Sequence, residues 1–146
     1  SWPIFTNPEE KFEIGKAQKM ISGKDVTIIA YGHMVWKSIE AEEILQAEGI
    51  SVELINMHTI KPLDVETILN TVKKTGCIVT AEEHNIIGGL GESVARVIGQ
   101  NEPCPQEFVA VNDSFGESGT PDQLLEKYGL SVGNIVMAAK RAISRK

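Results

Sequence analysis

Short apolar runs alternate with amphipathic stretches along most of this chain. Four runs rich in valine and isoleucine have the length of strands, at residues 26–31, 51–56, 77–81 and 107–111. Their nearly continuous hydrophobicity is typical of parallel strands that are covered on both faces. Because these strands alternate with helix-length segments, right-handed crossovers are expected, and we predict a three-layer α/β/α fold.

Helical periodicity fills the segments between these runs. A stripe of small and apolar residues, ended by a glycine, predicts a first helix: Met34, Ser38, Ala41, Leu45 and Gly49. A second helix is expected to start at the N-cap Asp64 and to end at Gly76, and a third to run from about Leu90 to Gly99. A last helix starts at Ser131 and ends in basic residues, where its dipole favours cations.

The remaining segments have weaker patterns. Residues 1–10 contain two prolines and no periodicity, so we interpret them as a linker, followed by one domain over residues 11–146. Loose alternation over residues 11–20 predicts an edge strand. A capping box that starts at Thr120 predicts a short helix up to Tyr128.

Charge and composition exclude several classes of protein. The chain has 14 Lys and Arg against 20 Asp and Glu, a net charge of −6, without a basic stripe that could neutralise nucleic-acid phosphates. No apolar run approaches the ~20 residues of a membrane helix. We expect a cytoplasmic protein that binds neither nucleic acid nor membrane. Cys77 and Cys104 form no C-x-x-C motif, and we expect them to be reduced thiols.

Three histidines follow three of the predicted parallel strands. In such sheets ligands bind beyond the carboxyl ends of the strands, so His33, His58 and His84, with Glu82 and Glu83, are candidates for a site there. The separations of 25 and 26 residues between the histidines contain no local metal-ligand motif. We therefore expect no metal, and we interpret the histidines as solvated or interface residues of this edge.

A glycine-rich turn opens the third helix, within residues 80–92. Backbone N–H groups at such a turn attract anions, and Gly88, Gly89 and Gly91 are the candidates for this role. The dinucleotide pattern fails, because its third glycine would stand at Val94. Phosphate binding is thus one interpretation, and close backbone packing or a subunit contact is the other.

The acidic loop at residues 112–119 does not predict a catalytic centre. The sequence around Ser118 is one residue short of a nucleophile elbow and follows a loop instead of a strand. Its carboxylates, with Asp122, are interpreted as a solvated cluster and not as a general acid and base. From the residues alone, we predict no self-sufficient active site.

Several segments together resemble the C-terminal domain of transketolase. They occur in family order, at residues 23–35, 59–64, 80–92 and 115–119 continuing to 124–130, and span nearly everything after residue 12. Jointly they are specific to the thiamine-diphosphate transketolase superfamily. The Thr-Ile-Lys-Pro-Leu-Asp segment and the Glu-Glu-His-(x)3-Gly-Gly-x-Gly-Glu spacing are most similar to transketolase itself.

The resemblance implies a five-stranded mixed sheet, with one antiparallel edge strand and four parallel strands. It implies that thiamine diphosphate and magnesium are held by an N-terminal domain with a Gly-Asp-Gly signature, which this sequence lacks. A middle domain would supply the glutamate that activates the cofactor. These two domains, on the same or a separate chain, are the implied partners, in a homodimeric enzyme of the pentose phosphate pathway.

The same resemblance implies a role in assembly, with no catalytic or cofactor-binding residue in this chain. The residues carried over form a loop that packs toward the rest of the enzyme: Glu82, Glu83, His84, Gly88, Gly89 and Gly91. Two alternatives stay open. One is the C-terminal domain of a deoxyxylulose-phosphate synthase or of a 2-oxo-acid dehydrogenase beta subunit, and the other is a regulatory module that binds an anion or nucleotide.

Overall fold

The computed structural model describes residues 15–58, 62–85, 89–111 and 132–146, with the backbone only at residues 84, 85 and 111. The elements in chain order are β1 (Gln18–Ile21), β2 (Val26–Ala30), α1 (Met34–Ala47), β3 (Val52–Asn56), α2 (Val65–Thr75), β4 (Ile78–Asn85), α3 (Leu90–Asn101), β5 (Gln106–Val111) and α5 (Val132–Ser144). The expected linker, the first residues of the expected edge strand, the acidic loop with its helix up to residue 128, and Ser131 lie outside the described residues.

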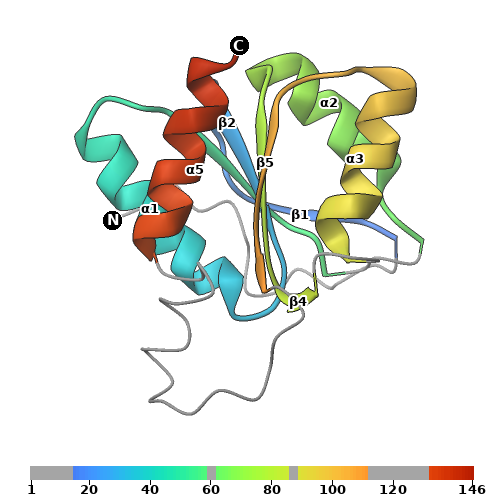
Figure 1. Cartoon of the computed structure of the whole chain (residues 1–146), viewed down its shortest axis with the longest axis horizontal. Helices are drawn as coiled ribbons and strands as arrows, with labels where there is room; N and C mark the ends of the chain where they lie inside the picture. Colours follow the sequence, from blue (N-terminus) through green and yellow to red (C-terminus); the bar gives the residue numbers. More distant parts are fainter. Residues whose placement is uncertain (1–14, 59–61, 86–88, 112–131) are drawn as a thin grey trace.

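The strands form one five-stranded sheet in the order β1-β3-β2-β4-β5. Only β1 is antiparallel, pairing with β3, while β2 pairs in parallel with β3 and β4, and β4 with β5. This arrangement confirms the predicted fold class and the antiparallel edge strand. Because β2 to β5 run the same way, their carboxyl ends share one edge of the sheet, at the bottom of Figure 1.

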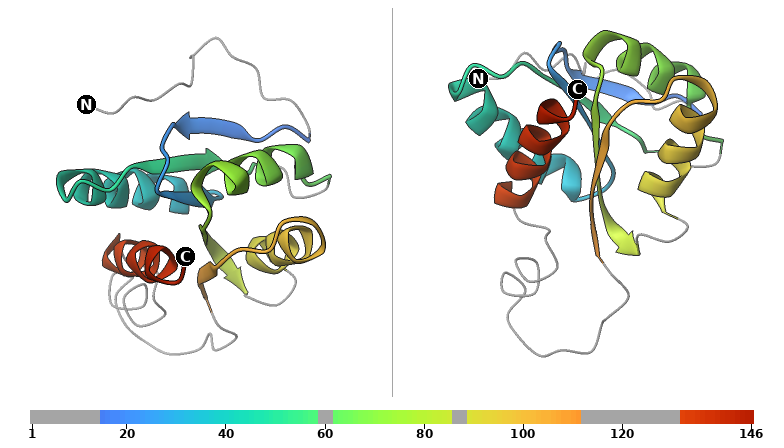
Figure 2. Two further views of the ribbon diagram at one scale, coloured as in Figure 1. Left: turned by 90° about the horizontal axis from the view of Figure 1, so that it is seen from above. Right: turned by 45° about the horizontal axis from the view of Figure 1, so that its top comes forward.

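The described helices lie on both faces of the sheet, as the views from two directions show (Figure 2). Helices α1 and α5 lie side by side on one face, and α2 and α3 on the other (Figure 1). Each face has its own apolar core. The first is centred on Ile28, Leu54 and Ile135, and the second on Ile29, Ile55 and Ile68. All six side chains are fully buried. Successive strand residues thus supply opposite cores, as the pleat requires.

Helix α2 has the local signals that its sequence predicts. The side chain of Asp64 accepts a hydrogen bond from the backbone N–H of Thr67 at 3.1 Å, which satisfies one free donor of the first turn. At the other end, Gly76 adopts φ 80°, a left-handed conformation that costs glycine little. Asp64 also accepts from the N–H of Ala17 at 2.8 Å and so ties the start of α2 to the segment before β1.

Basic residues at the end of α5 fasten this helix to its neighbours. Arg141 and Arg145 both pair with Glu107 on β5, and Lys140 pairs with Glu48 after α1 at 2.7 Å. The Nζ of Lys146 donates to the backbone carbonyl of Thr75, the last residue of α2, and to that of Asp25, which precedes β2. Within the described segments, no helix has the length and apolar character that a bilayer crossing requires.

Candidate functional site

Those sequence-predicted residues that the structure describes lie along the carboxyl edge of the sheet. The ends of β2, β3 and β4 are in register there, since Ala30 pairs with both Asn56 and Ala81. His33 follows the end of β2 by three residues, and His58 follows the end of β3 by two residues. Glu82 and Glu83 continue the third strand past the same level. The edge therefore gathers the candidates on neighbouring strands.

Glu82 is the best-defined residue of this edge. Its side chain is 1% exposed, and its two carboxylate oxygens accept hydrogen bonds from the backbone N–H groups of Leu90 and Gly91, each at 2.7 Å. These N–H groups belong to the first turn of α3, where the helix itself offers no acceptor. Gly89 at the N-cap has no side chain that could fill the role. Glu82 therefore caps α3 from the adjacent strand, with its negative charge at the positive end of the helix dipole.

The glycine at position 91 allows β5 and α3 to come into close contact. A Cβ atom there would lie 2.5 Å from the Phe108 ring and 2.9 Å from the Thr80 hydroxyl. The Nε2 of Gln106 adds a bridge, donating to the carbonyl of Gly91 at 2.9 Å and to the Thr80 hydroxyl at 3.1 Å. Close packing is thus a sufficient reason for Gly91.

One sequence expectation about this edge is wrong. The strand predicted over residues 77–81 runs on to Asn85, so Glu82, Glu83 and His84 belong to β4 and not to a loop after it. The apolar pattern ends at Ala81, and the pairing with β5 is irregular between Ala81 and Asn85, so neither periodicity nor a regular ladder marks the extension. Glu83 is half-buried, whereas Gly88 and the side chain of His84 lie outside the described residues.

The histidines do not form a described metal centre. His33 is exposed at the N-cap of α1 and makes no side-chain cap hydrogen bond. His58 follows β3 and is half-buried. Over residues 15–58, 62–85, 89–111 and 132–146, no group of three or more His, Cys, Asp or Glu side chains could hold a metal ion.

The start of α3 also does not fit a diphosphate group such as that of thiamine diphosphate. Anions bind at helix N-termini because free N–H groups point toward them. Here the carboxylate of Glu82 already accepts from two of these groups. A second anion would meet a buried negative charge and two donors that are already bonded. The geometry thus favours the packing interpretation of the glycine-rich turn over anion binding.

A second polar cluster, which the sequence analysis did not single out, surrounds Glu53 on β3. This carboxylate is 1% exposed and accepts hydrogen bonds from Lys74 at 2.6 Å, from the Thr71 hydroxyl at 2.7 Å and from the N–H of Gly23 at 3.2 Å. Burial alone would raise the pKa of Glu53, but these donors, with Lys19 nearby, outweigh it and hold the pKa below its usual range. The cluster links β3, α2 and the β1–β2 turn, and is a stabilising network.

The signal for Glu53 was present in the sequence. A glutamate in the middle of an apolar, strand-length run has to be buried, and a buried carboxylate needs donors. The same reasoning applies to Glu42, which follows Ala41 on the buried stripe of α1 and is 2% exposed.

Comparison with known proteins gives a consistent result. The profile of the family described as "Transketolase, C-terminal domain" matches residues 15–135. The 6-deoxy-6-sulfo-D-fructose transketolase subunit SqwH of Clostridium sp. (strain MSTE9) is 46% identical, over 94% of this chain and 42% of its own length. The 1-deoxy-D-xylulose-5-phosphate synthase of Heliobacterium modesticaldum is 36% identical, over 87% of this chain and 20% of its own length.

A solved structure extends the likeness to three dimensions. The chain of a split gene transketolase, described as an inactive beta4 tetramer, superimposes with a TM-score of 0.92 and 46% identity, over 99% of this chain and 48% of its own. In each case the present chain spans less than half the length of the protein that it matches.

Proposed function

Because the chain belongs to the transketolase C-terminal domain family, we propose that it is the assembly domain of a thiamine-diphosphate-dependent transketolase. The whole enzyme would move a two-carbon ketol unit between sugar phosphates in the cytoplasm. The observation that supports this role most directly is the pair of hydrogen bonds from Leu90 and Gly91 to Glu82. Through these bonds the Glu82 carboxylate holds α3 in place. In a catalytic site we would expect such a carboxylate to be available to a ligand.

Under this proposal the chemistry belongs to other domains. An N-terminal domain binds thiamine diphosphate and magnesium, and a middle domain supplies the glutamate that activates the cofactor. This chain contributes no catalytic residue, and it binds those domains, on the same or a separate polypeptide, in a homodimeric enzyme. The segment of Glu82, Glu83, His84, Gly88, Gly89 and Gly91 would then face the rest of the enzyme, with His33 and His58 beside it.

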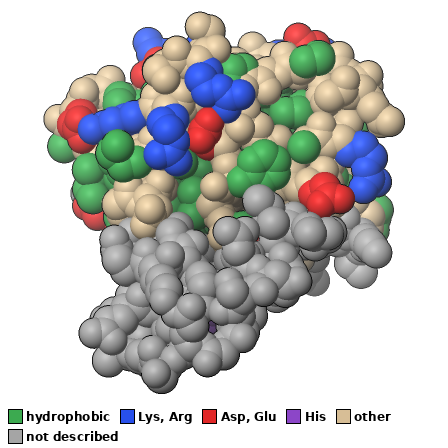
Figure 3. All heavy atoms as spheres, in the orientation of Figure 1, with side chains coloured by type: hydrophobic (Ala, Val, Ile, Leu, Met, Phe, Trp, Pro, Cys, Tyr) green, Lys and Arg blue, Asp and Glu red, His purple; other side chains and the backbone are tan. Residues whose placement is uncertain are grey.

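Exposed apolar side chains support an assembly role. Trp36 on α1 is 69% exposed and Met137 on α5 is 53% exposed, and these two helices lie side by side. Apolar side chains gather over α1 in the space-filling view (Figure 3). Contiguous apolar patches on a protein surface commonly mark contact sites. We infer that this helical face contacts the remaining domains.

A domain exchange tests the proposal. In the Clostridium subunit the matching segment, 42% of its length, is replaced by this chain. The chimera is expected to assemble with the rest of that enzyme and to transfer ketol groups, whereas the subunit without any such segment does neither. Light scattering after size-exclusion chromatography measures assembly, and a coupled assay measures turnover. A chimera that behaves like the truncated subunit, or ketol transfer by the isolated chain, would refute the proposal.

The match to the synthase supports a second candidate, the C-terminal domain of a 1-deoxy-D-xylulose-5-phosphate synthase. The domain would have the same architectural role in an enzyme that makes 1-deoxy-D-xylulose 5-phosphate. Assays of the complete enzyme separate the two candidates. Ketol transfer between sugar phosphates identifies a transketolase, and formation of 1-deoxy-D-xylulose 5-phosphate identifies a synthase.

A further inference from the structure

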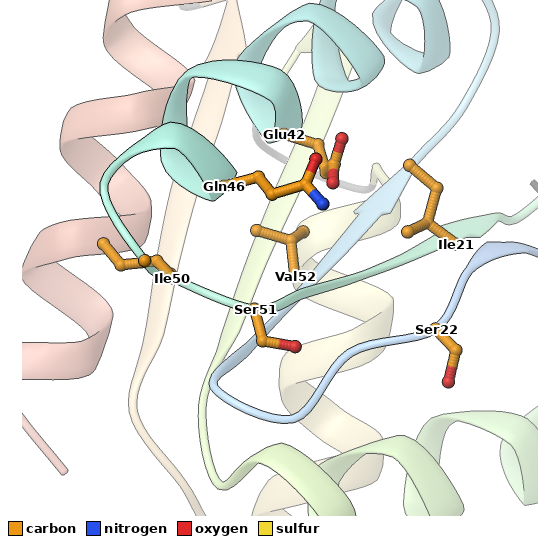
Figure 4. A pocket seen from close by; sticks show the side chains of 8 residues that line it. Ile21, Ser22, Glu42, Gln46, Ile50, Ser51 and Val52 are labelled. Carbon is orange, nitrogen blue, oxygen red and sulfur yellow. The ribbon is translucent and has the colours of Figure 1, made fainter. Parts of the chain in front are cut away.

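A small cavity of about 230 Å³ lies at the amino end of the parallel strands, away from the carboxyl edge. It is open to solvent on one side and is lined by the last turns of α1, the α1–β3 loop, the end of β1 and the start of β3 (Figure 4). Its walls are formed by Ile21, Ser22, Glu42, Gln46, Gly49, Ile50, Ser51 and Val52. Pockets for drug-sized ligands span ~300–1,000 Å³, so this one suits only a smaller group.

Glu42 is the charged group of this cavity. Its side chain is 2% exposed, and its Oε2 accepts no hydrogen bond from any described residue. In the close-up, Glu42 and Gln46 extend from α1 toward Ile21 (Figure 4). Burial raises the pKa of Glu42, and the neighbouring charge of Glu43 raises it further. Leaving a buried carboxyl group without a donor is costly.

The walls of the cavity supply no cationic donor, because they include no lysine or arginine. Ser51 accepts a hydrogen bond from the N–H of Lys24 at 3.1 Å, and Ser22 accepts one from the Nζ of Lys74 at 2.8 Å. No described group, the amide of Gln46 included, donates to the Oε2 of Glu42. The remaining surface includes the apolar side chains of Ile21, Ile50 and Val52. A fitting ligand therefore has a cationic donor at one end and a short alkyl chain at the other.

We propose that this cavity binds a primary alkylammonium group, with the ammonium on the Glu42 carboxylate and the alkyl chain against Ile21, Ile50 and Val52. An ammonium ion offers three donors to the buried oxygens and neutralises their charge. A divalent cation would need about six oxygen ligands, which a single carboxylate cannot provide. The source of the group is either a free small amine or the lysine side chain of a protein partner.

Titration with n-butylammonium tests the proposal on the intact chain at pH 7. Calorimetry should give one site with a dissociation constant of roughly 1 mM, and the amide resonances of Ile21, Ile50 and Val52 should shift on binding. The ¹³C resonance of the Glu42 carboxyl should move toward its ionised position. n-Butanol, which keeps the alkyl chain without the charge, should bind at least about tenfold more weakly. A peptide with one central lysine distinguishes the two sources. If the peptide saturates the same site, the group comes from the side chain of a protein partner. If n-butylammonium binds and the peptide does not, the group comes from a free small amine.

Two glutamine variants provide the matched control. Glu42→Gln removes the buried charge and should weaken n-butylammonium binding at least about tenfold. Glu43→Gln removes the same charge one residue along, on an exposed side chain, and should leave the binding nearly unchanged. Thermal unfolding of both variants checks that the fold is intact. Absence of saturable binding, equal binding of n-butanol, or equal losses in both variants would overturn the proposal.

Discussion

The Glu82 carboxylate lies 2.7 Å from the backbone nitrogen of Gly91, nine residues further along the chain. This contact crosses from a strand to the helix that follows it, and a second one to Leu90 accompanies it. A carboxylate that accepts two backbone N–H groups inside the protein contributes more than a surface cap, because no water competes for these groups. The carboxyl edge of this domain is thus fixed by a buried charge.

Replacing Glu82 by glutamine should destabilise the domain. The amide retains one acceptor and places an NH₂ group against a backbone donor, so one N–H group loses its partner and the charge at the helix dipole is lost. We expect the free energy of unfolding in urea to fall by about 1–3 kcal/mol. Glu83→Gln, on the half-buried neighbour, is the control and should stay within about 0.5 kcal/mol of the original chain. Equal effects of the two variants would contradict the cap.

Gly91 and Gly99 form a matched pair within α3. A Cβ at Gly91 would overlap the Phe108 ring at 2.5 Å, whereas a Cβ at Gly99 would meet nothing within 4 Å. We expect Gly91→Ala to lower the melting temperature, by a loss of about 1–3 kcal/mol in stability. Gly99→Ala should raise it, with a gain of up to about 1 kcal/mol, because alanine is the better helix former. A Gly91→Ala variant as stable as Gly99→Ala would show that the contact with Phe108 is not close.

Glu53 and Asp64 are two of the carboxylates that make the stability of the domain sensitive to acid. Burial alone would raise the pKa of each group, but the hydrogen bonds that each accepts lower it below its usual value. Their stabilisation is therefore fully present above the ordinary carboxyl range and is lost as the pH falls through the lowered folded-state values. We expect the unfolding free energy to be level above about pH 5 and to decrease steadily below about pH 4. Urea titrations across this range measure it.

Lys74 provides the specific test of the Glu53 network. Lys74→Met removes the closer of the two lysines that pair with the buried Glu53 carboxylate and leaves Lys19 at 3.8 Å, so stability at pH 7 should fall by about 2 kcal/mol. The loss should shrink at low pH, where Glu53 is protonated in both proteins. Lys73→Met, at the exposed position immediately before Lys74, serves as the control. A loss that is independent of pH would assign the effect of Lys74→Met to packing and not to charge.

How far the sequence predicts this fold depends on the range of each interaction. The caps of α2 were predictable, because Asp64 and Gly76 act within their own helix ends. The four parallel strands were also predictable, because burial on both faces makes their sequences apolar. The continuation of β4 beyond Ala81 was not predictable from the sequence. Glu82 is buried there only because α3 offers its carboxylate two hydrogen-bond donors. Such a contact joins residues whose proximity the sequence pattern does not reveal.

The same limit applies to the cavity near Glu42. Its helix was predicted, and the stripe that buries it was recognised. The cavity, however, depends on how Ile21 and Ser51 meet α1 across separate strands. Tertiary packing thus determines which polar groups of a predicted helix become buried without a partner.

Substitution of Trp36 distinguishes an effect on folding from an effect on assembly. With 69% of its side chain exposed, Trp36→Ala should change the stability of the isolated chain by less than about 1 kcal/mol. In the chimera described above, the same change should weaken assembly about tenfold, as expected for the loss of an aromatic contact at an interface. Val65→Ala, on the opposite face and 41% exposed, is the control and should leave assembly unchanged. Sedimentation velocity over a concentration series measures both, and unaltered assembly of the Trp36→Ala chimera would exclude the α1 face as the contact.

We have proposed that this chain supports a thiamine enzyme without itself binding the cofactor. Titration of the isolated chain with thiamine diphosphate and Mg²⁺, followed by calorimetry, is the decisive experiment. We predict no saturable heat up to millimolar ligand. One-to-one binding in the micromolar range, abolished by substitutions among its own side chains, would contradict the account.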